Sequence, residues 1–210
     1  MTCGPSTPPR RSRAVLFHHG APALGGGTLR TGPGLAALRE VSAACLSPAG
    51  QLQVATALDV LEVLEDRMHE LRHRLLEAAR HLAGAKVLAA RLYGVGPFAA
   101  LAMTCWLGGA GRFSSSRKAV RFAGLDVTVY SSDGKRSPGH LSRQGPEILR
   151  WVAYEAGKTH GRASAPGHDY YAQVKDRQDG KIAALSQARK LIRQACRILA
   201  ELGDDALTAA

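Results

Sequence analysis

An apolar residue recurs at every seventh position between residues 54 and 82, and a second apolar series lies three positions further on. Two such series define one face of an α-helix, and four heptads in succession are typical of a coiled coil. The series are Val54, Leu61, Met68, Leu75 and Leu82, and Ala57, Leu64, Leu71 and Ala78. We expect a long helix over residues 51–84, ended near Gly84, whose partner is a second copy, another helix of the chain or a further segment.

This helix contains the sequence His69-Glu70-Leu71-Arg72-His73, which matches the HExxH pattern of zinc proteases. Its position argues against a metal site, because Met68 and Leu71 occupy the apolar seam and both histidines then face solvent. A catalytic zinc site needs a shaped, largely dry pocket, and no clear third ligand follows. We therefore predict a solvated coiled-coil face here and no metal-binding residue.

The rest of the chain predicts a mainly α fold. Residues 1–50 read as a low-complexity or disordered leader with one short helix over 35–45, and residues 204–210 as a tail. Between them, residues 86–203 predict a compact helical domain with a minor β element at 127–130 and a polar loop over 131–141. The helices are expected over 86–92, 97–107, up to 122, 146–158, 169–177 and 181–202.

Charge and composition narrow the class of partner. The 28 Lys and Arg residues exceed the 17 Asp and Glu residues, which gives a net charge of +11 and points to nucleic acid. No apolar run is long enough to span a membrane. Cys3, Cys45, Cys105 and Cys196 form no CxxC pair, so we expect a reducing, cytoplasmic setting.

Two segments are candidates for contact with nucleic acid. Gly94 and Gly96 stand in a turn before Pro97 that resembles a helix-hairpin-helix turn, where a phosphate could meet free backbone N–H groups; the alternative is a tight turn between packed helices. The last helix carries a basic outer face, which either binds nucleic acid or is simply solvated. We expect Trp106, Trp151, Tyr170 and Tyr171 to anchor the core.

The stretch from Arg112 to Arg150 combines serines with many basic residues. A serine hydroxyl needs a neighbour that stabilises the charge of the reaction, and arginine binds two phosphate oxygens at once. Such a set suits a recombinase that forms a phosphoserine bond with DNA. A polar loop with capping serines is the alternative, with Ser142 as a cap of the following helix. The basic candidates are Arg117, Lys135, Arg136, Arg143 and Arg150.

A series of short motifs, taken in order, resembles the C-terminal domain of the Piv/MooV-like insertion-sequence transposases, which are bridge-RNA-guided serine recombinases. The motifs are Leu92-Tyr93-Gly94-Val95-Gly96, Arg112-Phe113, Phe122-Ala123-Gly124-Leu125, Tyr130-Ser131-Ser132, Leu141-Ser142-Arg143-Gln144-Gly145, Leu149-Arg150 and Tyr170-Tyr171. The resemblance covers about residues 86–203, and the helix over 51–84 fits the family's coiled-coil linker.

The resemblance implies a serine nucleophile shortly after Gly124-Leu125, which places it at Ser132, with Ser131 as a rival. It implies attack on a phosphodiester, a covalent protein–DNA intermediate and strand exchange, with DNA, a guide RNA and a homo-oligomer as partners. Arg136, Arg143 and Arg150 are the candidates for phosphate neutralisation. Asp133 departs from the family pattern, because a glycine usually follows the serine there.

Relatives in this family begin with a RuvC-like domain whose four acidic residues hold a divalent metal such as Mg²⁺. The first acidic residue here is Glu40, so we expect no cofactor in this chain and a truncated transposase. The alternative is a non-catalytic, self-associating transposase remnant that binds nucleic acid.

Overall fold

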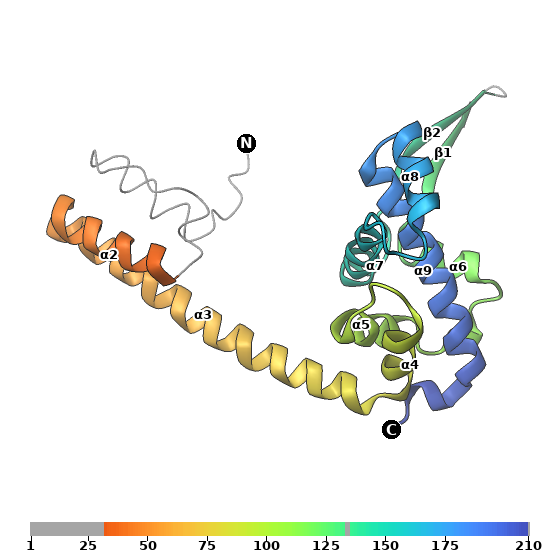
Figure 1. Cartoon of the computed structure of the whole chain (residues 1–210), viewed down its shortest axis with the longest axis horizontal. Helices are drawn as coiled ribbons and strands as arrows, with labels where there is room; N and C mark the ends of the chain where they lie inside the picture. The colour runs from red at the N-terminus through yellow and green to blue at the C-terminus, as the bar shows by residue number, and fades with distance from the viewer. Residues whose placement is uncertain (1–31, 133–134, 210) are drawn as a thin grey trace. The chain divides into compact units, whose positions relative to one another are not determined.

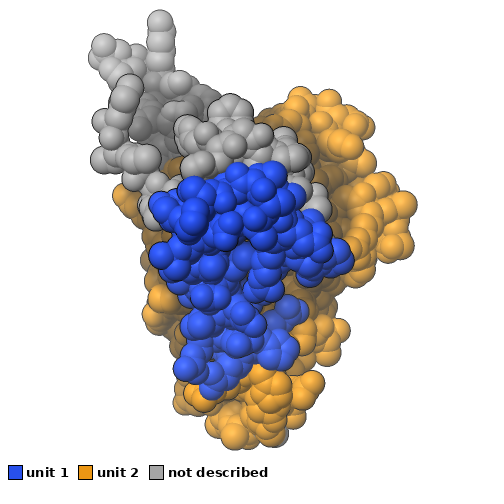
Figure 2. Space-filling model, turned by 90° about the vertical axis from the view of Figure 1, so that its left-hand side faces the viewer, with its two compact units in different colours: residues 1–72 blue, residues 73–210 orange. Residues whose placement is uncertain are grey.

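The computed structural model describes residues 32–132 and 135–209, and for residues 128–132 and 135–140 it describes the backbone alone. The chain divides into two compact units, residues 1–72 and 73–210 (Figure 2). The boundary between them lies inside the long helix over Pro48–His81. Within the described residues the fold is mainly helical with one β-hairpin (Figure 1), as the sequence predicts.

The first unit contains a pair of consecutive helices. Helix α2 (Gly32–Cys45) lies beside the first part of α3 (Pro48–His81), and the two are joined by a two-residue turn (Figure 1). Leu38 and Leu46 pack against Val54 and Leu58, and all four side chains are buried. The predicted heptad helix is therefore present, and apolar contacts stabilise its first turns against α2.

Further along α3, the middle of the heptad seam has no apolar partner within the described chain. Leu64, Met68 and Leu71 are 49%, 69% and 57% exposed. The helix ends at His81, because Leu82 adopts an extended backbone, and Gly84 lies inside the next helix. The expected end at Gly84 is thus wrong. A β-carbon at Gly84 would come within 2.7 Å of the Ala206 carbonyl oxygen, so close packing explains this glycine.

The second unit is built around a long C-terminal helix. Its elements are α4 (Ala83–Arg91), α5 (Pro97–Leu107), η2 (Ala110–Arg112), α6 (Ser116–Phe122), β1 (Val127–Ser132), β2 (Lys135–Leu141), α7 (Glu147–Thr159), α8 (His168–Arg177), α9 (Gly180–Leu202) and η3 (Gly203–Leu207). Helices α4 to α8 all pack against α9. Residues 204–210, which the sequence predicts as a tail, belong to this unit, since Ala206 is fully buried.

Local signals in the sequence define both ends of α9. The Asp179 side chain accepts hydrogen bonds from the backbone N–H groups of Lys181 and Ile182, which is the geometry of an N-cap. Gly203 ends the helix with a positive φ of 58°. Small buried residues such as Ala184 and Ala188 then let α7 approach closely, because a β-carbon at Gly157 would lie 2.4 Å from the Ala184 oxygen.

The β-hairpin differs from the sequence prediction. Strand β1 begins at Val127 as expected, but residues 135–141, expected as a loop, form the antiparallel strand β2. The register pairs Ser132 with Lys135 and Ser131 with Arg136, and it shifts between Val127 and Val129. Backbone pairing from β1 gives this polar segment its extended structure, although its side chains are poor strand formers.

The positions of the aromatic residues are a second difference between the structure and the sequence prediction. Trp106, Trp151 and Tyr170 are 43%, 53% and 37% exposed, so they are not the core anchors that the sequence predicts. The core consists instead of aliphatic side chains and alanines, with Leu88, Met103, Leu149, Ile192 and Leu199 at its centre. Among the described residues, no helix has the length and apolar character needed to cross a membrane.

Among the described side chains of this second unit, one histidine lies buried. His160 follows α7, is 6% exposed, and has no hydrogen-bond partner at either ring nitrogen. Its ring meets the Tyr93 ring edge-on, with centroids 5.3 Å apart. Gly167 also lies against it, because a β-carbon there would come within 2.6 Å of Nδ1. Burial, with a smaller contribution from Lys190, lowers the pKa of His160 below 6.5.

We predict that the second unit loses stability in acid because of His160. The unfolded chain binds a proton near pH 6.5, whereas the folded chain does so only at lower pH, so the free energy of unfolding falls as pH drops below 6.5. Thermal unfolding across this range should show the loss in the wild type and a smaller loss in His160→Gln. The exposed His73 provides the control, and an acid response in His160→Gln equal to that of His73→Gln would contradict the assignment.

Candidate nucleic-acid interface at the hairpin

The two strands of the hairpin leave the helical core through a tightly bonded base. The N–H of Ser142 donates to the Asp126 carbonyl at 2.8 Å, and the N–H of Arg143 donates to the Gly124 carbonyl at 3.3 Å. Gly124 has a φ of 67°, and a β-carbon there would lie 2.5 Å from the Gln144 carbonyl oxygen. This glycine is required both by its backbone conformation and by the close approach of the returning strand.

Two arginines from the core helices anchor this base. Arg189 of α9 donates from Nε to the Leu125 carbonyl at 2.8 Å, and Arg150 of α7 donates from Nη1 to the Arg143 carbonyl at 3.2 Å. Burial lowers the pKa of Arg189, whereas nearby Asp126 raises it. An arginine guanidinium stays charged even when it is partly buried, and its hydrogen bonds are stronger than those of a neutral donor. The anchors therefore fix where the hairpin starts.

The predicted site residues fall into two groups along the hairpin. Ser132, Lys135 and Arg136 lie at its far end, and Arg143 and Arg150 lie at its base. Five residue steps separate Val127 from Ser132, which corresponds to about 17 Å in a strand. An arginine side chain does not cover that distance, so the basic residues at the base do not share a phosphate with Ser132 of the same chain.

The residues at the base have different surroundings. Arg143 is exposed and has a positive φ of 51°, which is uncommon for a residue other than glycine. Arg150 is half-buried and uses one nitrogen to bind the backbone. Ser142 does not cap α7, whose N-cap is Pro146, so that interpretation is wrong; its hydroxyl is buried without a hydrogen-bond partner.

The glycines of the helix-hairpin-helix-like turn also differ from each other. Helices α4 and α5 pack together and are joined by residues 92–96. Gly94 has a φ of 78°, and a β-carbon would collide with the Thr159 side chain and lie 3.0 Å from the Ala156 oxygen. Gly96 precedes Pro97 with nothing within 4 Å of such a β-carbon. Gly94 is therefore explained by packing against α7, whereas Gly96 leaves open space at the start of α5.

Arg112 and two phenylalanines form a further structural cluster. The Arg112 guanidinium lies 4.6 Å from the ring centroids of both Phe113 and Phe122 and donates to the Trp106 carbonyl at 2.7 Å. These contacts hold η2 against α6 through cation–π attraction. Arg117, by contrast, lies on the exposed face of α6 and is open to a ligand.

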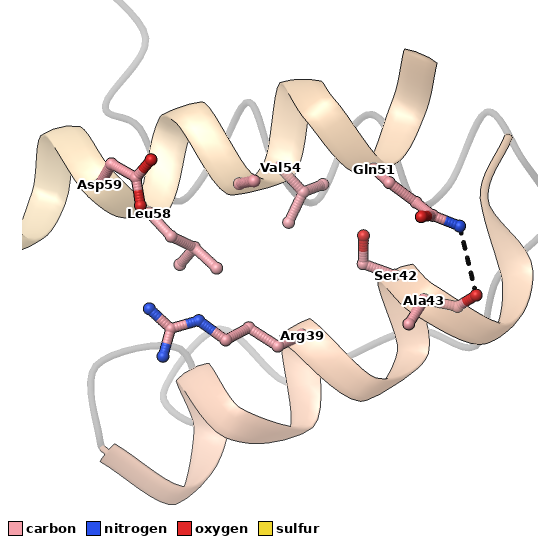
Figure 3. A pocket seen from close by; sticks show the side chains of 8 residues that line it. Arg39, Ser42, Ala43, Gln51, Val54, Leu58 and Asp59 are labelled. Carbon is pink, nitrogen blue, oxygen red and sulfur yellow. Dashed lines mark hydrogen bonds between the residues drawn. The ribbon is translucent and has the colours of Figure 1, made fainter. Parts of the chain in front are cut away.

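Two features of helices α2 and α3 offer less chemistry than the hairpin does. A cavity of about 230 Å³ between α2 and α3 is lined by apolar Val54 and Leu58, with Arg39 and Asp59 at one end (Figure 3). On α3, His69 and His73 are exposed, and Glu70 pairs with Arg67 at 3.1 Å. Within the described residues no group of three or more His, Cys, Asp or Glu side chains is placed to hold a metal.

Comparison with known proteins gives a family match for the middle of the chain. Residues 85–172 match the model of the transposase IS116/IS110/IS902 family. The match covers less than half of the chain, and it includes most of α4, all of α5 to α7, the hairpin and the start of α8. None of the curated proteins compared with the chain matches it. The match supports a transposase or recombinase function in general and DNA as the partner.

The sequence did not reveal Arg189 as a residue of this site. Its partner, the Leu125 carbonyl, is 64 residues away, and Arg189 lies beyond the matched segment. The available signal was its position at the edge of the apolar face of α9, where a long basic side chain can reach along a neighbouring element.

We predict that the two turn glycines respond differently to alanine. Gly94→Ala should lower the free energy of unfolding by about 2 kcal/mol, because the left-handed backbone and the contact with Thr159 both penalise a β-carbon. Gly96→Ala should change it by about 0.5 kcal/mol or less. Urea unfolding measures both, and equal losses would contradict the packing explanation for Gly94.

Proposed function

We propose that the chain is a DNA transposase of the Piv/MooV-like, bridge-RNA-guided type, and that Ser132 at the far end of the β1–β2 hairpin is its nucleophile. The family match across the hairpin supports the general function. The observation that carries the finer proposal is the strand register, in which Lys135 is the direct partner of Ser132 and Arg136 that of Ser131. Directly opposite residues have β-carbons about 4.5–5.5 Å apart, so a basic residue accompanies either serine.

In the proposed reaction the serine hydroxyl loses its proton to a base and its oxygen bonds to phosphorus. The bond from phosphorus to one deoxyribose oxygen breaks, and that oxygen takes up a proton as it leaves. The phosphoserine ester conserves the energy of the broken bond for strand exchange. Lys135 and Arg136 neutralise the phosphate, whereas Gly96, Arg117, Arg143 and Arg150 contact the DNA backbone further away.

A divalent metal belongs to the family's RuvC-like domain, and the described residues do not fit it, since they form no acidic cluster. No step proposed here passes through a metal. The chain's part is to position the hydroxyl and neutralise the phosphate. A guide RNA bound by the same basic surface and a cytoplasmic location follow from the proposed family.

We predict that Ser132 is required for a covalent protein–DNA adduct. The full chain, mixed with insertion-sequence-end DNA and a RuvC-like domain supplied separately, should yield an adduct that survives denaturing electrophoresis. Ser132→Ala should reduce it by about 10³-fold or more, because no other group supplies the attacking oxygen. Ser131→Ala is the matched control and should retain the adduct. Loss with Ser131→Ala alone would transfer the role to Ser131, and equal yields in all three proteins would refute serine attack.

We further propose that two copies of the chain pair through the α3 seam. Leu64, Met68 and Leu71 lie in the a and d positions and are about half or more exposed in the single chain. Burying the exposed part of such side chains against an identical helix would stabilise a dimer by about 1–2 kcal/mol for each.

We predict that charge on the seam separates the copies. Leu64→Lys with Leu71→Lys should convert a dimer into a monomer in sedimentation experiments, because buried lysines oppose pairing. Val63→Lys is the control, since Val63 is 60% exposed but lies off the seam. A wild-type monomer, or a dimer lost equally with Val63→Lys, would contradict this interface.

The alternative function is a non-catalytic, self-associating protein that binds nucleic acid. The exposed seam and the basic surface favour it, as neither requires the serine to react. Salt-sensitive DNA binding with no adduct in the serine experiment would support this function instead.

A further inference from the structure

Five arginines from α6 and α9 form a continuous series on the second unit, here called the basic stripe. They are Arg117, Arg121, Arg189, Arg193 and Arg197. Helices α6 and α9 pack against each other, and the contacts of Asp126 connect their basic residues. Asp126 lies 3.9 Å from Arg121 and interacts electrostatically with Arg189, whose neighbour Arg193 is one turn further along α9.

The members of the stripe are accessible. Arg117, Arg121 and Arg197 are exposed, while Arg189 and Arg193 are half-buried. On α6 the buried residues are Ala119 and Val120, so positions 117 and 121 share the outward face at a spacing of four. On α9 the three arginines also follow a spacing of four, which puts their α-carbons about 6 Å apart along one row.

The acidic residues near the stripe do not neutralise it. Asp126 is a single carboxylate and its 3.9 Å separation from Arg121 is long for an ion pair. Glu201, one turn beyond Arg197, pairs with Arg91 at 3.4 Å. The stripe therefore retains most of its positive charge.

We propose that the basic stripe is a second, sequence-independent contact with the phosphate backbone of duplex DNA, separate from the serine at the far end of the hairpin. A row of guanidiniums fits a polyanion whose charges repeat along its length, and it offers no pattern that reads base edges. The stripe continues onto α9, beyond the segment that matches the family model. Arg189 links the two regions, because it belongs to the stripe and anchors the hairpin base. The choice of DNA rests on the proposed function.

The test removes three exposed charges that make no strong contact within the described chain. The variant Arg117→Gln, Arg121→Gln, Arg197→Gln leaves the core and the Arg189 hydrogen bond in place, so it should fold. The matched control is Arg162→Gln, Lys175→Gln, Arg177→Gln, which removes three exposed charges near and on α8. Binding of the full chain to a short labelled DNA duplex is measured by fluorescence anisotropy over a range of salt concentrations.

The stripe variant should reduce the slope of log K against log salt by about 3, because each lost phosphate contact contributes about 1. The loss should be the same for duplexes of unrelated sequence, and the control should keep the wild-type slope. A slope unchanged in the stripe variant, or reduced equally in the control, would overturn the proposal. A loss that depends on DNA sequence would also overturn it.

The same measurement on an RNA duplex separates the two sources of phosphate. A reduced slope on DNA supports the proposal whether or not RNA responds, whereas a reduction on RNA alone would overturn it. If the stripe variant keeps wild-type DNA binding but loses binding to an acidic protein, the proposal would be overturned as well. Binding does not use Ser132, so absence of a covalent adduct would refute the proposed function and leave the stripe result standing.

Discussion

Hydrogen bonds from two arginines to backbone carbonyls at the base of the β1–β2 hairpin connect the helical core to its only β element among the described residues. A two-stranded hairpin has marginal stability by itself in water. Here Arg189 from α9 and Arg150 from α7 bind the backbone at the base of the hairpin. The carbonyls of Leu125 and Arg143 thereby gain charged donors, each stronger than a neutral one. The direction in which the hairpin leaves the core therefore depends on α7 and α9 being packed together.

That packing depends in turn on small residues. Gly157 of α7 lies against Ala184 and Ala188 of α9 at distances that exclude any larger side chain. Close approach of the helices brings their longer residues to the edges of the interface, where Arg150 and Arg189 reach the hairpin. The alanine-rich inner face of α9 thus has a function besides filling the core, because it sets the distance over which the two anchors can act.

Sequence patterns predicted most of the helices, because several of them have a local signal. The Asp179 cap, Pro97 at the start of α5 and the positive φ of Gly203 all act within one turn. Strand β2 has no such signal. Its residues include Lys135, Pro138 and Gly139, and its extended form depends on pairing with β1. Gly84 was assigned to a helix end because its close neighbours Ala206, Thr104 and Leu199 lie far along the chain, and only the fold reveals the packing that requires glycine.

The sequence nominates candidate site residues, but it does not predict how the fold spaces them. Ser132, Arg136, Arg143 and Arg150 lie within twenty positions of the sequence, which suggests that their side chains form one cluster. An antiparallel hairpin instead places residues near its turn at one end and residues that flank it at the other, about 17 Å apart here. If Ser132 is the nucleophile, guanidiniums at the hairpin base serve the DNA on either side of the attacked phosphate. Charge at that phosphate must then come from Lys135 and Arg136 or from a second chain. If two copies pair through the exposed α3 seam, as we propose, the second copy is one source of that charge, because the hairpin is too long for the base of the same chain to supply it.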